Sequence, residues 1–111
     1  MSEEEQIEQL KELFFRYEDF LDQKGFVNQF VPFDIAGTTL DPEFYDEGIK
    51  VTITIQTFDE VSLNEDLSEL VADSIYDYLR ENRDLEEEVR GLDIDPEWVN
   101  WWFVVKTELV E

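Results

Sequence analysis

The chain has 111 residues and a formal net charge of −22, because 30 acidic residues stand against 8 basic ones. Phosphate binding needs lysine and arginine, so this charge excludes direct contact with nucleic acid and disfavours an anionic membrane surface. Histidine and cysteine are absent, which removes the usual general base, the commonest metal ligand and thiolate chemistry. The length predicts one domain over residues 1–111, and a hydrophobic content of 42% is sufficient for a packed core.

Residues 3–24 predict the first helix. Ser2 can cap it, because Glu5 follows three residues later in the capping-box pattern, and Gly25 is a typical stop signal. Apolar residues recur at the helical period and predict the buried face, which consists of Ile7, Leu10, Leu13, Phe14, Tyr17, Phe20 and Leu21.

The next part of the chain predicts a strand followed by a loop. Residues 26–35 are extended and apolar, and Pro32 within them favours an edge strand or a bulge. Residues 36–48 contain glycines, acids and the Asp41-Pro42 pair, which together indicate a loop.

Residues 49–58 form the clearest predicted strand. Apolar and polar side chains alternate, so one face is expected to pack against the core while the other faces water. The packed face consists of Ile49, Val51, Ile53 and Ile55, and the wet face consists of Lys50, Thr52, Thr54 and Gln56.

Residues 64–90 predict the second helix, with a break near residues 82–84. Asn64 is a favourable N-cap, and Gly91 is a stop signal. The predicted buried stripe of this helix consists of Leu67, Leu70, Val71, Ile75, Tyr78 and Leu79.

After a turn at residues 91–97, residues 98–110 predict a strand that is apolar on both faces at its centre. Such a pattern is typical of a strand inside a sheet. The element order is therefore α-β-β-α-β. It predicts an α+β fold, in which a small antiparallel or mixed sheet of about three or more strands packs with two main helices.

The acids of both helices are expected to form exposed stripes opposite the core. A helix advances about 100° per residue, which places the acids of the second helix between 0° and about 120° from Glu65, and its apolar stripe at about 220°. Like charges four residues apart repel each other, so a helix that only had to stay soluble would intersperse lysines. The candidate partner-binding acids are Glu65, Asp66, Glu69, Asp73, Asp77 and Asp84 on the second helix, with Glu8, Glu12 and Asp19 on the first.

Two aromatic residues fall on the acidic sides of these helices. Phe15 projects from the first helix and Tyr76 from the second, and aromatic anchors ringed by polar groups resemble binding hot spots. Both are therefore candidate partner-binding residues. The alternative is that they pack under the segment around Pro32 or under the 36–48 loop.

The short acidic motifs predict no catalytic or metal site. Residues 93–97 begin like a calcium loop, but the glycine and glutamate that such a loop needs further on are missing. Asp66-x-x-Glu69 and Glu81-x-x-Asp84 resemble the magnesium-binding pattern of all-helical nucleotide pyrophosphohydrolases, in which two facing helices supply the motifs. Here both motifs fall on one predicted helix with outward acids. We expect no enzymatic activity, no cofactor and no metal.

In size, charge and helix-plus-sheet make-up, the chain resembles the DNA-mimic proteins that phages and mobile elements use against host defences. These include anti-CRISPR and anti-restriction proteins. The resemblance covers composition and general architecture, and no residue motif carries it. It implies an inhibitor whose carboxylates occupy the basic cleft of a nucleic-acid-binding protein, such as a CRISPR effector or a restriction enzyme, and block it competitively.

Two other functions stay open. An immunity protein or antitoxin that neutralises a basic nuclease toxin relies on the same physics, and an acidic adaptor would dock mainly through its aromatic residues. A strand carrying Trp98, Trp101 and Trp102 could also pair with its copy in a homodimer. The acidic start of the chain and the lack of an apolar run of about 20 residues predict a soluble cytoplasmic protein, inside a bacterial host cell if a phage encodes it.

Overall fold

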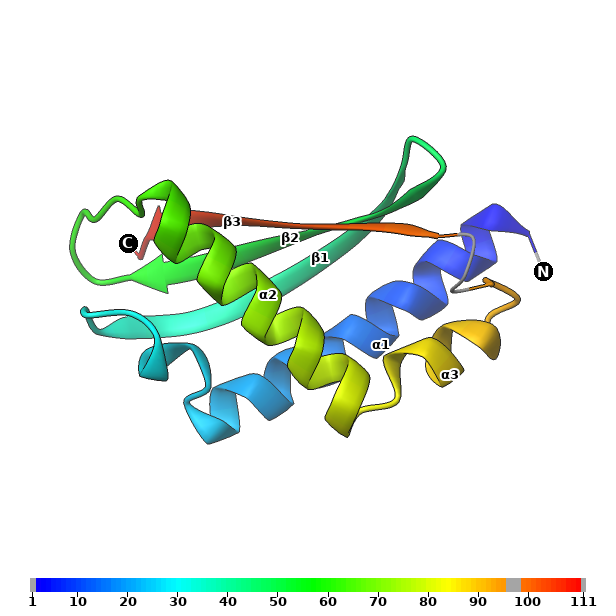
Figure 1. Ribbon diagram of the computed structural model, residues 1–111, viewed down its shortest axis with the longest axis horizontal. Coiled ribbons are helices and arrows are strands. Elements are labelled where there is room, and N and C mark those ends of the chain that lie inside the picture. The colour runs from blue at the N-terminus through cyan, green and yellow to red at the C-terminus, as the bar shows by residue number, and fades with distance from the viewer. Residues whose placement is uncertain (1, 96–98, 111) are drawn as a thin grey trace.

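The computed structural model describes residues 2–95 and 99–110. The predicted α+β fold is confirmed, and no helix in these ranges is long and apolar enough to cross a membrane. The elements follow in the order α1 (Glu3–Lys24), the 3-10 helix η1 (Val27–Gln29), β1 (Ile35–Tyr45), β2 (Gly48–Thr57), α2 (Glu65–Asn82), α3 (Leu85–Arg90) and β3 (Asn100–Leu109) (Figure 1).

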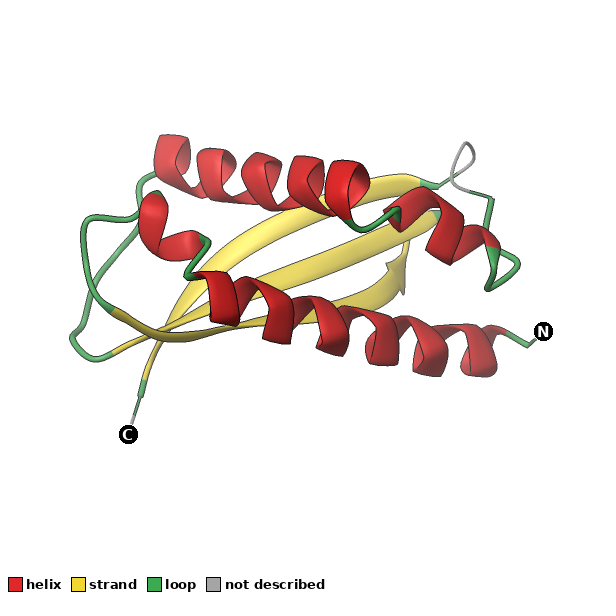
Figure 2. Cartoon of the chain, turned by 90° about the horizontal axis from the view of Figure 1, so that it is seen from below, coloured by secondary structure: helices red, strands yellow, loops and turns green. Residues whose placement is uncertain are grey.

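The three strands form one mixed sheet with β2 in the centre. β1 pairs antiparallel with β2, and β3 pairs parallel with β2 after the crossover through α2 and α3. α1 packs on β1 and α2 packs on β3, so among the described residues the helices cover one face of the sheet only (Figure 2). The molecule is elongated and measures 42 × 24 × 24 Å along its principal axes.

The core lies between the sheet and the helices. The packed face predicted for β2 is confirmed, because all four of its apolar side chains are fully buried. The helices supply the opposite side of the core with Leu10, Phe14 and Leu21 from α1 and with Val71, Ile75 and Leu79 from α2. Each such side chain contributes about 1.5–3 kcal/mol through removal from water.

Local capping signals fix the ends of the helices as predicted. The Ser2 hydroxyl accepts from the Glu5 N–H at 3.3 Å, and the Asn64 side-chain oxygen accepts from the Leu67 N–H at 2.7 Å. Gly25 ends α1 at φ 59°, a left-handed conformation that favours glycine. The predicted break in the second helix separates α2 from α3.

The segment between α1 and β2 differs from the prediction. Residues 26–35 form η1 and an irregular connection instead of a strand, and β1 occupies most of the predicted loop at 36–48. The hairpin that follows turns through Asp46 and Glu47 alone, with φ of 42° and 61°. Positive φ at both central residues is the geometry of a two-residue hairpin, which matches the twist of the flanking strands.

Pro42 is compatible with β1 because its nitrogen lies on the outer edge of the sheet. The N–H groups of Thr38 and Leu40 donate to Asp22 and Glu18 of α1, so these residues direct their backbone groups away from β2. Alternate residues of a strand direct those groups to the same side. The N–H that proline lacks would therefore have pointed outward, and no bond to β2 is lost.

The interior position predicted for residues 98–110 is wrong. β3 is an edge strand, and α2 covers only one of its faces. Trp101 and Phe103 lie on the covered face, whereas Trp102 and Val104 lie on the face without a helix. Both faces of β3 are thus apolar although only one faces the core, and Trp98 lies outside the described residues.

Gly48 allows β3 to begin close to β2. A Cβ at this position would overlap the carbonyl oxygen of Asn100 and would lie 2.9 Å from Cζ3 of Trp102. The indole of Trp102 in turn packs edge-on against Tyr45, with 5.6 Å between ring centroids. Glycine at the start of β2 is therefore required by packing.

Candidate partner-binding surface

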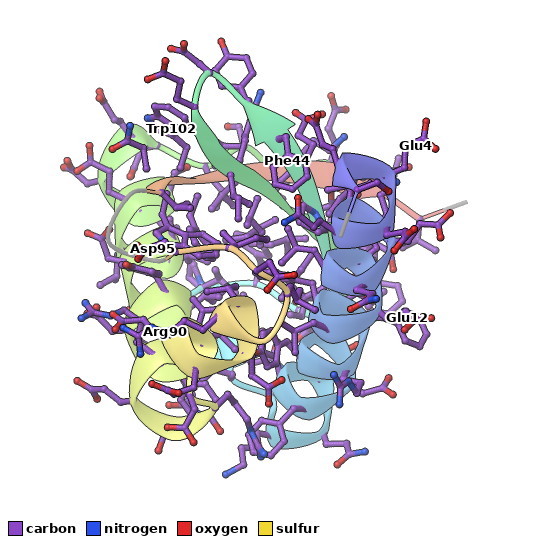
Figure 3. All side chains as sticks on the ribbon, turned by 90° about the vertical axis from the view of Figure 1, so that its right-hand side faces the viewer. Glu4, Glu12, Phe44, Arg90, Asp95 and Trp102 are labelled. Carbon is purple, nitrogen blue, oxygen red and sulfur yellow. The ribbon has the colours of Figure 1, made fainter. Side chains whose placement is uncertain are left out.

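The acids singled out in the sequence lie on the surface of the helices. Within the described residues, none of them forms an ion pair. Figure 3 shows Glu4 and Glu12 of α1 pointing away from the core. The exposed candidates are Glu8, Glu12 and Asp19 on α1, Glu65, Asp66, Glu69, Asp73 and Asp77 on α2, and Asp84 at the junction with α3.

The two acidic stripes face different directions. α1 packs on β1 and α2 packs on β3, which are the two opposite edge strands of the sheet. The view along the long axis in Figure 3 accordingly shows α1 on one flank of the molecule and α2 on the other, with α3 beside α2. The structure therefore provides two acidic flanks and does not merge them into one face.

The buried face of α2 is rotated from the direction predicted. Its buried residues are Val71, Ala72, Ile75 and Leu79, which centre at about 295° from Glu65 instead of about 220° at 100° per residue. The small side chain of Ala72 lets this side of the helix approach the sheet. A rotation of about 75° moves one expected core residue out and one expected surface residue in.

Tyr76 is the residue that turns inward, so its predicted place within the acidic stripe is wrong. Its ring packs against Trp101 and Phe103 of β3, with centroid distances of 6.2 and 5.2 Å. The guanidinium of Arg80 lies 5.3 Å from the ring on the outer side. Burial raises the pKa of the Tyr76 hydroxyl, as expected for a side chain that holds α2 on the sheet.

Each long helix exposes one large apolar side chain among its acids. Phe15 of α1 is 63% exposed beside Asp19, so it does not pack under a neighbouring segment, which was the alternative for this residue. Leu70 of α2 is 48% exposed between Asp66 and Asp73, although the sequence predicted it to be buried. The sequence signal for Leu70 was its position on the helical wheel, next to the acids at the margin of the apolar stripe.

Two carboxylates of α1 belong to the sheet and not to the stripe. Glu18 accepts from the Leu40 N–H at 2.6 Å, and Asp22 accepts from the Thr38 N–H at 3.1 Å. Partial burial raises the pKa of both carboxyl groups, and the backbone hydrogen bonds oppose that rise. Both side chains cover the outer edge of β1.

The junction of α2 and α3 gathers further acids around one cation. Asp84 has left-handed backbone geometry with φ 51°, which redirects the chain into α3. Arg80 pairs with Glu86 across the junction at 3.1 Å, and Asp77 and Glu81 line the same shallow depression. Among the described residues, no three acidic side chains converge in the manner of a metal site.

Comparisons with known protein families, with curated proteins and with solved structures find no match for this chain. A function can therefore be inferred only from the arrangement of its charges and of its exposed apolar side chains.

Proposed function

We propose that the protein is an acidic nucleic-acid mimic, which occupies the basic DNA- or RNA-binding cleft of a target protein and blocks it competitively. The observation that supports this function best is the charge per unit length. The protein carries −22 over a length of 42 Å. B-DNA carries one negative charge per ~1.7 Å of its axis, which gives about 25 charges over the same length, or about 12 base pairs.

The position of the carboxylates also supports this function. The three helices contain 17 acidic and 5 basic residues, and the stripe acids face solvent without an ion pair in the described part of the chain. Such carboxylates are available to the lysines and arginines of a cleft, and arginine can bind each of them in a bidentate manner. A basic partner would relieve the repulsion between neighbouring acids on the same helix.

Phe15 and Leu70 support a contact of defined orientation. Binding energy at interfaces is concentrated in a few apolar or aromatic anchors that polar groups surround. A flank that presents one such anchor among acids can therefore be both attracted by charge and seated by packing. This feature is shared with an immunity protein that binds a nuclease toxin, so the choice of targets in the experiment has to separate the two.

The test measures inhibition of purified nucleases by the intact protein. The panel contains a CRISPR effector, a restriction endonuclease and a basic nuclease toxin, each assayed on duplex DNA. Under the proposal, the protein inhibits the effector or the restriction enzyme, excess DNA relieves the inhibition, and added salt weakens it. Inhibition of the toxin alone would favour the immunity-protein alternative.

Two matched variants locate the binding flank. The first neutralises Asp66, Asp73 and Asp77 of α2 to asparagine, and the second neutralises Glu8, Glu12 and Asp19 of α1 to glutamine or asparagine. The flank that binds should lose about tenfold or more in affinity when neutralised. A control of equal net charge carries Asp34→Asn, Asp46→Asn and Glu60→Gln, which lie outside the helices and strands. Equal inhibition by all three variants would contradict the proposal.

A further inference from the structure

The two edge strands of the sheet differ in whether their outer backbone N–H groups have hydrogen-bond acceptors. The outer N–H groups of β1 at Thr38 and Leu40 are bound by carboxylates of α1. On β3, the N–H of Val110 donates inward to the carbonyl of Thr57, so the alternate residues Thr107 and Leu109 direct their backbone groups outward. Within the described residues, no backbone hydrogen bond is made at this outer edge, which leaves the backbone of β3 as the free edge of the sheet. The hydroxyl of Thr107 donates to the carbonyl of Val61 on the face that the helices cover.

The free edge is apolar and has no net charge. Val104 and Leu109 of β3 and the adjacent Val110 are each at least 40% exposed. β3 contains one basic residue, Lys106, and one acidic residue, Glu108. In a protein of net charge −22, this strand offers a surface that another copy can approach without meeting a run of acids.

We propose that β3 pairs antiparallel with β3 of a second copy of this chain, about a two-fold axis at Thr107. The two three-stranded sheets then join into one sheet of six strands. In this register Lys106 lies opposite Glu108 of the other copy, and the same pair recurs across the axis. Val105 lies opposite Leu109, and Val104 lies opposite Val110, so the exposed apolar residues cover one another.

The sequence around Thr107 favours a second copy over an unrelated strand. A two-fold interface requires that residue i contacts residue j while j contacts i, and a lysine and a glutamate placed on either side of the axis satisfy this requirement. Because α1 closes the β1 edge, each copy has one free edge. Association therefore ends at the dimer and does not continue into a fibre.

Added salt should affect formation of the dimer and binding to a basic partner in opposite ways. The helices of one copy cover one face of its sheet (Figure 2), so a two-fold axis perpendicular to the sheet places the helices of both copies on the same side, where their acids repel. Salt screens this repulsion, because the Debye length falls from ~30 Å at ~0.01 M to ~8 Å at ~0.15 M ionic strength. Added salt therefore strengthens self-association, whereas it weakens binding to a cationic cleft.

Sedimentation equilibrium of the intact protein tests the dimer and its register. We expect a monomer–dimer equilibrium that shifts toward dimer between about 0.05 M and about 0.5 M NaCl. Lys106→Glu places two like-charged pairs across the axis and should raise the dissociation constant about tenfold or more. The Lys106→Glu, Glu108→Lys double variant recreates both pairs in reverse and should restore the dimer.

A mixture of two single variants gives the sharpest outcome. Lys106→Glu and Glu108→Lys each repel their own copies, but they attract each other at both pairs, so an equimolar mixture should form heterodimers. Lys50→Glu makes the same charge change on the neighbouring strand and should leave the dissociation constant unchanged. Circular dichroism confirms that every variant is folded. A protein that stays monomeric in high salt, or a dimer that Lys106→Glu weakens no more than Lys50→Glu does, would overturn the proposal.

Discussion

The helices and the strands of this protein carry very different amounts of charge. The helices α1, α2 and α3 contain 17 acidic and 5 basic residues, a net charge of −12, whereas β1, β2 and β3 contain 3 acidic and 2 basic residues, a net charge of −1. A helix can bury one face and expose like charges on the other, where water and salt screen them. In a sheet, like charges on adjacent strands face one another directly. Most of the repulsion between like charges therefore falls on the helices, where water and salt screen it, and the sheet stays nearly neutral.

One substitution in α1 should weaken the packing between the helices and the sheet. Phe14 is fully buried, packs edge-on against Tyr17, and approaches Trp101 of β3 with 6.5 Å between ring centroids. Phe14→Ala should lower the free energy of unfolding by about 3–5 kcal/mol, which urea denaturation would measure. The adjacent Phe15→Ala removes an exposed ring and should change stability by less than about 0.5 kcal/mol. Similar losses in the two variants would contradict the assignment of Phe15 to the surface.

The sheet itself depends on the close approach at Gly48. Gly48→Ala forces a methyl group into Asn100 at the start of β3, so it should cost about 1–3 kcal/mol in urea denaturation. Gly37→Ala is the matched control, because its Cβ would meet only the flexible side chain of Gln56 at 3.3 Å. A cost at Gly37 as large as that at Gly48 would show that strand entropy, and not the contact with β3, determines the effect.

The start of α2 depends on a single cap. Asn64→Ala leaves the Leu67 N–H without its acceptor at 2.7 Å and should lower the free energy of unfolding by about 1 kcal/mol. Ser2→Ala removes a longer bond, of 3.3 Å, near the end of the chain and should cost less. Thermal unfolding of both variants measures the difference, and a larger loss for Ser2→Ala would reverse this ranking of the two helices.

The response to pH is the smallest expected effect. Burial raises the pKa of Glu18 and Asp22 in the folded protein, so the folded chain binds more protons than the unfolded chain between the ordinary and the raised values. Stability therefore falls as pH rises through that range, and the melting temperature should increase as pH is lowered from about 7 toward the ordinary carboxyl pKa values of about 4.

Matched charge variants assign this response to the edge of β1. Glu18→Gln with Asp22→Asn should flatten the pH dependence, whereas Glu4→Gln with Glu8→Gln, which removes two exposed charges of α1, should retain it. Solvent screening keeps the effect modest, because both Glu18 and Asp22 are only partly buried. A melting temperature that falls on acidification would contradict the raised pKa values.

The sequence correctly predicts the elements whose ends and faces are determined by residues close together in the chain. The Ser2 cap, the apolar period and Gly25 define α1 over the predicted residues, and strict alternation locates β2 to within one residue. β1 could not be found in this way, because its outer N–H groups find their acceptors in Glu18 and Asp22 of a distant helix. The proline and acids of that segment therefore looked like a loop.

The candidate surface could be predicted only in part, because some of its side chains take their positions from contacts outside their own helix. Helical periodicity places the acids outward regardless of what the opposite face touches. The rotation of α2 that buries Tyr76 and exposes Leu70 depends on the aromatic face of β3, which lies outside the sequence window of the helix. The edge position of β3 likewise follows from strand order, which no local pattern encodes.

Because the helices and the sheet carry different charge, the molecule has a preferred orientation in an electric field. Acids are concentrated in the helices, whereas the charges of the sheet nearly balance, so negative charge lies mainly on the helical side of the molecule. In the field of a cationic cleft such a body rotates during approach, so the helices lead and the sheet trails. Productive collisions then become more frequent without any change in the contacts of the final complex.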